Sequence, residues 1–228
     1  MNLARSLALV AAISATASHA IGGHFAVDDA TILDVGQCQV EIWGERADDA
    51  GALFHVGPAC RVGPIELSLN AERIEPRGGG PLTLIGPQIK WATPVDDRVS
   101  VGVVASATWR GSAPHVVVAT LYAPLSVRVA GPLLVSVDFG RDWLRDSVSR
   151  PHVGVSFEWQ VTPAWTLVGE RFRQFGGDFA RLGVHWQPNA SLGFDLSRAR
   201  GLGPAAERAW TLGATLAFAA PTGARPAP

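Results

Sequence analysis

The sequence predicts an all-β fold: a single antiparallel, up-and-down transmembrane β-barrel of about twelve strands. Three observations support it. Polar and apolar residues alternate through most of the chain, tight turns alternate with longer loops, and tryptophans gather at strand ends. The 228 residues suit one all-β domain, and only 17% are charged, below the roughly 25% of average soluble domains. The net charge of -1 offers phosphates no basic surface, so we expect no nucleic-acid partner.

Residues 1–20 have the pattern of a secretory signal peptide. Arg5 precedes an apolar core over residues 7–13, and small residues follow up to a favoured cleavage point after Ala20. An ordinary buried helix is the alternative. Beyond these residues, no stretch approaches the roughly 18 consecutive apolar residues of a membrane helix. We therefore expect export, with residues 21–36 forming a flexible periplasmic N-terminal extension.

The two cysteines, Cys38 and Cys60, are expected to form a disulfide, because export leads to an oxidising compartment. Alternating segments on either side of a turn around Asp49 predict a hairpin in which the two cysteines lie directly opposite each other. The same register places Trp43 opposite His55 on the polar face. Metal binding or a reactive thiol is the alternative, but no second cysteine pair accompanies them.

Alternation with a period of two residues indicates strands with one polar face. In residues 65–72 the odd positions are apolar and the even positions are polar, and residues 153–160 repeat the pattern. Segmentation on this basis predicts strands at residues 37–46, 52–62, 65–74, 82–92, 98–110, 115–123, 132–143, 152–161, 165–174, 179–187, 191–199 and 209–218. Residues 125–131, between Pro124 and Pro132, could belong to the sixth strand, the seventh or neither.

The connections alternate in length, which is typical of barrels that cross an outer membrane. Tight links such as 63–64 and 162–163 contain proline, whereas links such as 75–81 and 200–207 are longer and rich in glycine or charge. The barrel is expected over residues 37–218. The Pro/Ala-rich residues 219–228 are expected to form a disordered tail.

Aromatic residues are expected to form two girdles at the membrane interfaces, because strand-end tryptophans have no packing role in a soluble sandwich. The residues assigned to these girdles are Trp91, Trp109, Trp159, Trp165, Trp186, Trp210 and Phe218.

With these features the chain resembles bacterial outer-membrane β-barrel proteins. Its last strand ends in the aromatic Phe218, and that pattern looks like the signal read by the barrel-assembly machinery. Ten residues follow it. Residues 86–91 and 165–170, the latter after a Thr-Pro turn, are loosely similar to small barrel transporters linked to phenol-degradation pathways. The resemblance implies a cell outer-membrane location and transport.

If the apolar faces meet lipid, the polar faces line the lumen. The residues expected there are Glu41, Glu66, Lys90, Asp138, Glu158, Glu170, Arg181, His185 and Asp195. Lys90 and Arg181, facing carboxylates, could set an electrostatic filter in a narrow pore. Alternatively, these charges neutralise one another in a buried network that closes the barrel.

No catalytic constellation, cofactor or structural metal is expected, since the mature histidines are scattered and no nucleophile elbow is present. Ser147 or Ser149, with His115 or His152 near the outer rim, would be the candidates for a barrel hydrolase. His24 with Asp28 and Asp29 could hold a metal weakly.

The favoured function is an outer-membrane channel or transporter for passive passage of small aromatic or carboxylated solutes. The expected partners are outer-membrane lipids and lipopolysaccharide, the barrel-assembly machinery and a small-molecule solute. A non-transporting structural or adhesive barrel, a barrel hydrolase and a soluble periplasmic β-sandwich are the alternatives.

Overall fold

A computed structural model describes residues 24–48, 51–112, 115–145, 147–203 and 207–220, so the expected signal peptide and most of the expected tail lie outside these residues. Twelve antiparallel strands close into one barrel, as predicted. They are β1 (Gln37–Ala47), β2 (Gly51–Val62), β3 (Ile65–Pro76), β4 (Leu82–Pro94), β5 (Val99–Arg110), β6 (Val116–Ala130), β7 (Leu133–Leu144), β8 (Arg150–Thr162), β9 (Trp165–Gln174), β10 (Gly177–Asn189), β11 (Leu192–Gly201) and β12 (Arg208–Ala219).

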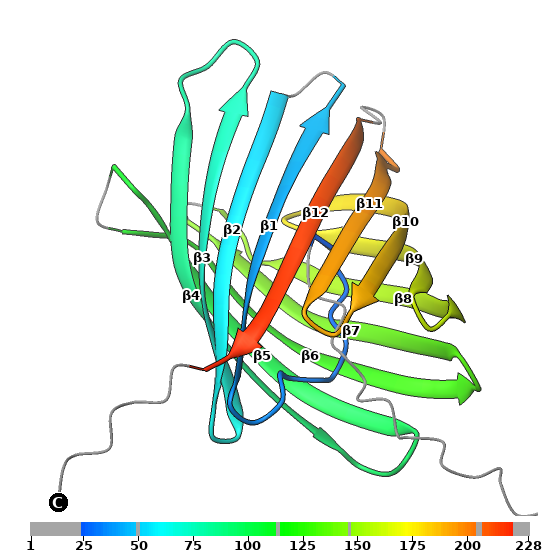
Figure 1. Cartoon of the computed structure of the whole chain (residues 1–228). Coiled ribbons are helices and arrows are strands. Elements are labelled where there is room, and N and C mark those ends of the chain that lie inside the picture. The colour runs from blue at the N-terminus through cyan, green and yellow to red at the C-terminus, as the bar shows by residue number, and fades with distance from the viewer. Residues whose placement is uncertain (1–23, 49–50, 113–114, 146, 204–206, 221–228) are drawn as a thin grey trace, which may run out of the picture.

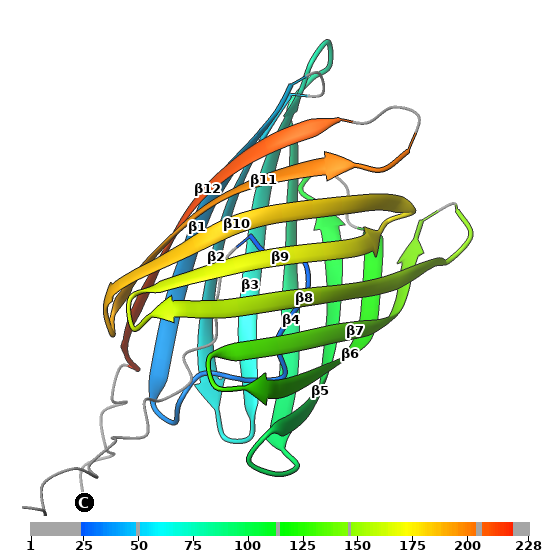
Figure 2. The same cartoon turned by 90° about the vertical axis from the view of Figure 1, so that its right-hand side faces the viewer.

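Each strand is paired with its neighbour in sequence, and β1 closes the barrel against β12 (Figures 1 and 2). The described part of the chain has no helix that is long and apolar enough to cross a bilayer.

Alternation sorts the side chains between the two faces of the wall. Along β7, Ser136 and Asp138 are buried, whereas Val137 and Phe139 between and beyond them are 40% and 74% exposed. The buried face is the polar one, which is the reverse of a water-soluble barrel. This inversion is expected when the outer face meets hydrocarbon and the inner face encloses polar groups.

The first hairpin has the register that its sequence predicts. Cys38 pairs with Cys60 across β1 and β2, and Trp43 pairs with His55. The disulfide Cys38–Cys60 is formed, which confirms the predicted pairing. Period-two alternation together with a central turn was therefore sufficient to fix the register of this hairpin.

The sixth strand is longer than its predicted range and runs through Pro124. Proline lacks the N–H of a ladder hydrogen bond, and it normally marks an edge or an irregular position. Here the neighbouring strand supplies Gly102, where an added Cβ would lie 3.1 Å from the proline ring. The small residue makes room for the ring, so the strand continues, and residues 125–130 belong to β6.

The two ends of the barrel differ, and we name them by their connections. At the turn end, which carries both β1 Gln37 and β12 Ala219, the links are tight, as at 63–64 and 163–164. At the loop end the links are mostly longer, as at 77–81 and 202–207. The link 175–176 between β9 and β10 is a tight exception.

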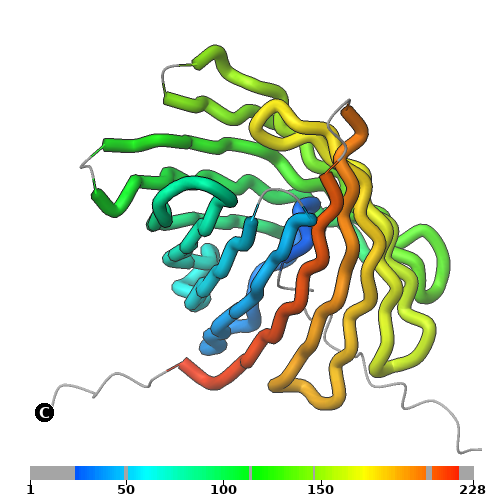
Figure 3. The backbone as a smooth tube through the Cα atoms, turned by 90° about the horizontal axis from the view of Figure 1, so that it is seen from above, coloured from blue at the N-terminus to red at the C-terminus, as the bar shows by residue number. Residues whose placement is uncertain are grey.

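The described part of the N-terminal segment lies inside the barrel. Residues 24–34 run through the lumen, and the chain turns at Gly36, with φ of 77°, before entering β1 (dark-blue tube in Figure 3). Val27, Ala30 and Leu33 are each at most 7% exposed. This differs from the flexible periplasmic extension expected for residues 21–36. The reason is that lumen side chains supply the hydrogen bonds that water would otherwise give this segment.

Candidate functional site: the barrel lumen

Residues 24–34, which we call the plug, are held by side chains from many strands of the wall. Glu170 on β9 accepts hydrogen bonds from the backbone N–H groups of Ala26 at 3.3 Å and Val27 at 2.8 Å. Asp138 on β7 accepts from Asp28 N at 2.9 Å. Further along the plug, Ser126 on β6 accepts from Ala30 N at 2.8 Å, and Glu66 on β3 accepts from Leu33 N at 2.9 Å. Lumen carboxylates and a hydroxyl therefore satisfy the plug backbone as a paired strand would.

Lumen cations bind the plug through its oxygen atoms. The Lys90 ammonium on β4 lies 3.0 Å from Asp28 Oδ1 and 3.5 Å from Asp29 Oδ1. Arg61 Nη1 donates to the Leu33 carbonyl at 2.9 Å, and Arg181 donates to the His24 carbonyl. The charges of the lumen thus bind the plug as well as one another.

The Tyr122 hydroxyl on β6 donates to the carboxylate of Asp28. On the opposite side of the lumen, His24 Nε2 and the Ser197 hydroxyl on β11 are 2.5 Å apart. The plug is therefore anchored to walls on both sides of the lumen.

Two lumen glycines leave room for side chains of the plug. A Cβ added at Gly154 on β8 would lie 2.5 Å from Val27 Cγ2, and one at Gly183 on β10 would lie 2.9 Å from the Phe25 ring. Any other residue at either position would collide with the plug, because real Cβ contacts are not this short. The space that small lumen residues provide is thus occupied by plug side chains.

His24 is the titratable group of the plug whose protonation changes on docking. Burial lowers the pKa of His24 from 6.5 to about 3, with further lowering by the nearby Arg181 guanidinium. Docked His24 is neutral at pH 7, and the undocked ring would take up a proton in mild acid.

The structure places the sequence-predicted lumen residues on the inner face. Glu66, Lys90, Asp138, Glu158, Glu170, Arg181, His185 and Asp195 are buried, and Glu41 is half-buried. Their charged groups do not form a single electrostatic filter but separate pairs. Arg181 lies 3.6 Å from Glu170 and 3.5 Å from Glu45, His185 lies 2.8 Å from Asp195, and Lys90 is occupied by the plug.

Sequence reasoning missed a second aspartate–histidine pair on the lumen wall. His152 Nδ1 on β8 lies 3.1 Å from Asp142 Oδ1 on β7, which also accepts from the Thr120 hydroxyl at 3.0 Å. Tyr122 stacks on the His152 ring with centroids 4.3 Å apart. Asp142 and His152 both occupy even-numbered positions, which are the lumen-facing ones of these two neighbouring strands. This was the signal in the sequence that could have identified the pair.

The His152 pairing bears on the alternative of a barrel hydrolase. The Ser149 hydroxyl accepts from Arg141 at 3.0 Å, whereas His152 faces the lumen with Asp142. Among the described residues, no group of three or more His, Cys, Asp or Glu side chains has the geometry to hold a metal ion.

The predicted interface aromatics lie on the outer face. Trp91, Trp159, Trp165, Trp186, Trp210 and Phe218 are exposed on the isolated chain, and Trp109 is half-buried. Trp165 stacks on Trp186 at 5.6 Å between β9 and β10 near the turn end. Trp43 instead faces the lumen, where it stacks on His55 at 4.7 Å.

Between the plug and the loop end lies a cavity of about 740 Å³, which we call the vestibule. Its floor includes plug residues 24–29, and its walls include Glu41, Trp43, His55 and Glu72. This volume is in the range of cavities that take drug-sized ligands.

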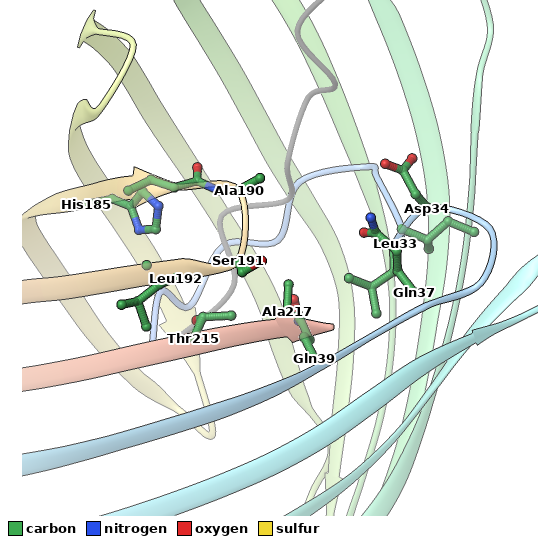
Figure 4. Close-up of a pocket in the computed structure, with 13 residues that line it drawn as sticks. Leu33, Asp34, Gln37, Gln39, His185, Ala190, Ser191, Leu192, Thr215 and Ala217 are labelled. Atoms are coloured by element: carbon green, nitrogen blue, oxygen red, sulfur yellow. The ribbon is translucent and has the colours of Figure 1, made fainter. Parts of the chain in front are cut away.

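At the turn end the free space beside the plug is much smaller. A cavity of about 40 Å³ lies between the plug and the wall formed by β1, β12 and the β10–β11 turn. Figure 4 shows Leu33 and Asp34 on one side and Ser191, Leu192 and Thr215 on the other. This cavity holds a few water molecules at most and is too small for an organic solute.

The fold and the occupied lumen define a plugged β-barrel of the outer-membrane type. A family described as "Uncharacterised conserved protein UCP029691" matches residues 9–218, and the chain belongs to that family. No curated protein shows a significant match to the chain.

Solved structures share the fold at low sequence identity. A KdgM porin superposes with a TM-score of 0.67 at 10% identity, covering 79% of this chain and 99% of the porin. A NanC porin superposes with a TM-score of 0.59 at 7% identity, covering 78% and 98%. Outer membrane phospholipase A from Escherichia coli gives a TM-score of 0.52 at 13% identity, covering 78% and 92%. These likenesses establish a shared twelve-stranded architecture.

Proposed function

We propose that this protein is an outer-membrane channel for passive passage of small solutes, and that its own N-terminal plug closes the channel in the conformation described here. The observation that carries the proposal is the plug in the lumen, with a vestibule of about 740 Å³ on one side of it and a cavity of about 40 Å³ between the plug and the wall at the other end. Opening then requires the plug to move or leave.

The alternative of a purely structural barrel is less well supported. A barrel whose lumen served only to hold the wall together would fill its interior with side chains, as eight-stranded barrels do. Here a cavity of about 740 Å³ beside the plug is not filled by side chains. The plug is joined to the wall by discrete hydrogen bonds, such as Val27 N to Glu170, and by the Lys90–Asp28 ion pair. Such contacts can be exchanged for water when the segment leaves.

The cellular setting belongs to the same proposal. The signal peptide would direct export, the barrel-assembly machinery would insert the barrel, and lipids and lipopolysaccharide would surround its aromatic girdles. The turn end would face the periplasm. Passage of a small aromatic solute, one of the expectations from the sequence, is part of the proposal, as is the lack of catalytic activity.

Planar-bilayer recording tests the proposal with a variant that lacks residues 24–34. The intact protein should show rare or small openings, and the deletion variant should show steady conductance at least tenfold higher on average. Both proteins must first show a heat-dependent mobility shift, which verifies a folded barrel. A folded deletion variant without conductance would overturn the channel and favour the structural barrel.

A further inference from the structure

The wall of the vestibule changes character near the loop end. Lumen-facing positions at mid-barrel are mostly polar, whereas several of those nearer the loop end carry large apolar side chains beside polar ones such as Glu45 and Glu207. The apolar residues, which we call the collar, are Leu53, Ile74, Leu84, Val118 and Phe179, and all five line the vestibule. They come from five strands, and the alternating pattern expected for a simple aqueous lumen would place polar groups there. The collar therefore offers an apolar surface to anything that enters from this end.

Beside the collar the vestibule is acidic, since Leu53 pairs with Glu45 across β2 and β1 and Leu84 pairs with Glu72 across β4 and β3. Seven carboxylates line it, against two cations. Both cations already have partners: Lys90 is paired with Asp28 and Asp29, and Arg181 is paired with Glu45 and Glu170. The surplus is therefore negative. A positive charge that enters a cavity with low-dielectric walls and a surplus of one sign of charge is attracted more strongly than it would be in bulk water.

An aromatic pair lies next to Glu72, because His55 pairs with Glu72 across β2 and β3. Trp43 on β1 stacks on His55 on β2 with an angle of 7° between the rings. His55 Nδ1 is buried and has no hydrogen-bond partner, although Glu72 Oε1 lies 3.5 Å away. Of the eight tryptophans in the chain, Trp43 is the one that lines the vestibule. Tryptophan is the ring that best attracts an organic cation.

We infer that the vestibule binds an amphipathic organic cation, with its apolar body within the collar and its ammonium head among Glu41, Glu45 and Glu72 near Trp43. This deepens the proposed function by naming its solute class. Apolar burial supplies affinity, and the carboxylates select the sign of the charge. A carboxylated solute, which the sequence left open, is disfavoured because its head would meet the same surplus of negative charge.

Calorimetry on the full-length protein in detergent tests the site with three probes that share a phenyl body. They are 2-phenylethylammonium, 2-phenylethanol and 3-phenylpropanoate. We expect saturable binding of the ammonium probe, binding of the alcohol about tenfold weaker, and no saturable binding of the carboxylate. Ethylammonium, which has the head without the body, should also bind at least tenfold more weakly than 2-phenylethylammonium. Equal or tighter binding of the carboxylate would overturn the inference, as would no binding of the ammonium probe to the folded barrel.

Variants separate the two zones of the site. Glu41→Gln with Glu72→Gln should weaken the ammonium probe about tenfold and leave the alcohol unchanged, whereas Leu84→Ser should weaken both. Glu75→Gln is the matched control, because Glu75 lies exposed at the loop end, paired with Arg73 at 2.9 Å, and does not line the vestibule. Equal loss in Glu75→Gln and in the double variant would contradict the assignment.

The outcome is independent of the conductance test. Selective binding by a barrel that never conducts would remove the channel and keep the cation site. Conductance by the deletion variant without selective binding would support the channel and contradict the cation site.

Discussion

The Lys90 ammonium on β4 lies 3.0 Å from Asp28 Oδ1 in the plug, although the two residues are 62 positions apart in the chain. Lys90 is buried in the wall, and Asp28 also accepts a hydrogen bond from the Tyr122 hydroxyl. A buried cation without a partner is strongly unfavourable. The plug is thus part of the charge balance of the lumen.

Asp28→Asn should release the plug. Removing one partner of a fully buried ion pair costs about 3–5 kcal/mol. The cost here is smaller, because Asp28 is 30% exposed and Asp29 remains 3.5 Å from the Lys90 ammonium. We expect a higher open probability in bilayer recordings. Asp34→Asn makes the same charge change at an exposed residue and should behave as the wild type. Equal behaviour of the two variants would argue against an electrostatic hold on the plug.

The fit between Gly154 and Val27 predicts a pair of compensating substitutions. In Gly154→Ala the new Cβ would meet Val27 Cγ2 at 2.5 Å, and overpacking of this kind costs about 1–3 kcal/mol. The channel should open more often. Adding Val27→Ala removes the colliding atom and should restore closure. If the double variant stays as open as Gly154→Ala alone, the collision is not what displaces the plug.

Acidification should favour the open channel through His24. The ring has a pKa of about 3 when docked, against 6.5 when free, so the undocked state binds more protons between these values. Above pH 6.5 the His24 ring is neutral in both states and does not oppose docking. As the pH falls from 6.5 towards 3, the undocked ring takes up a proton that the docked ring does not, and docking becomes less favourable. Conductance should therefore rise between pH 7 and pH 5. Because lumen carboxylates also titrate, the measure is the difference from His24→Gln, which should show a flatter rise. Identical pH profiles would exclude a role for His24.

Loss of the disulfide should lower stability without opening the channel. Cys38 and Cys60 are 22 residues apart, and closing a loop of this size stabilises by about 3 kcal/mol in the chain-entropy argument. Cys38→Ser with Cys60→Ser should shift the gel mobility transition to a lower temperature. The disulfide joins neighbouring wall strands, so conductance below that temperature should not change. A large rise in conductance would show that this hairpin also holds the plug.

The wall was predictable from the sequence because a period of two residues specifies both the strands and their two faces. Cys38 and Cys60 then set one register, which the ladder reproduces. The path through Pro124 was not predictable, since it depends on Gly102 in the neighbouring strand. Such a pairing appears only once the barrel is assembled.

The plug and the collar were missed for related reasons. Residues 24–34 have no strand periodicity, and their partners Glu170, Asp138 and Lys90 are spread over three strands. Apolar residues such as Leu84 lie on the face of the strand that was expected to be polar. Alternation alone therefore could not assign these residues to the lumen. The sequence indicated which residues face the lumen, but not that part of the chain itself would occupy it.

A reversible lock on the plug tests the central claim most directly. Ala30 N lies 2.8 Å from Ser126 Oγ, so Ala30→Cys with Ser126→Cys should allow a disulfide that fixes the plug to β6. The oxidised double variant should show no openings, and a reductant should restore wild-type openings, with reductant-treated wild type as the control. Unchanged conductance in the verified cross-linked protein would contradict the account, because solute would then pass with the plug in place.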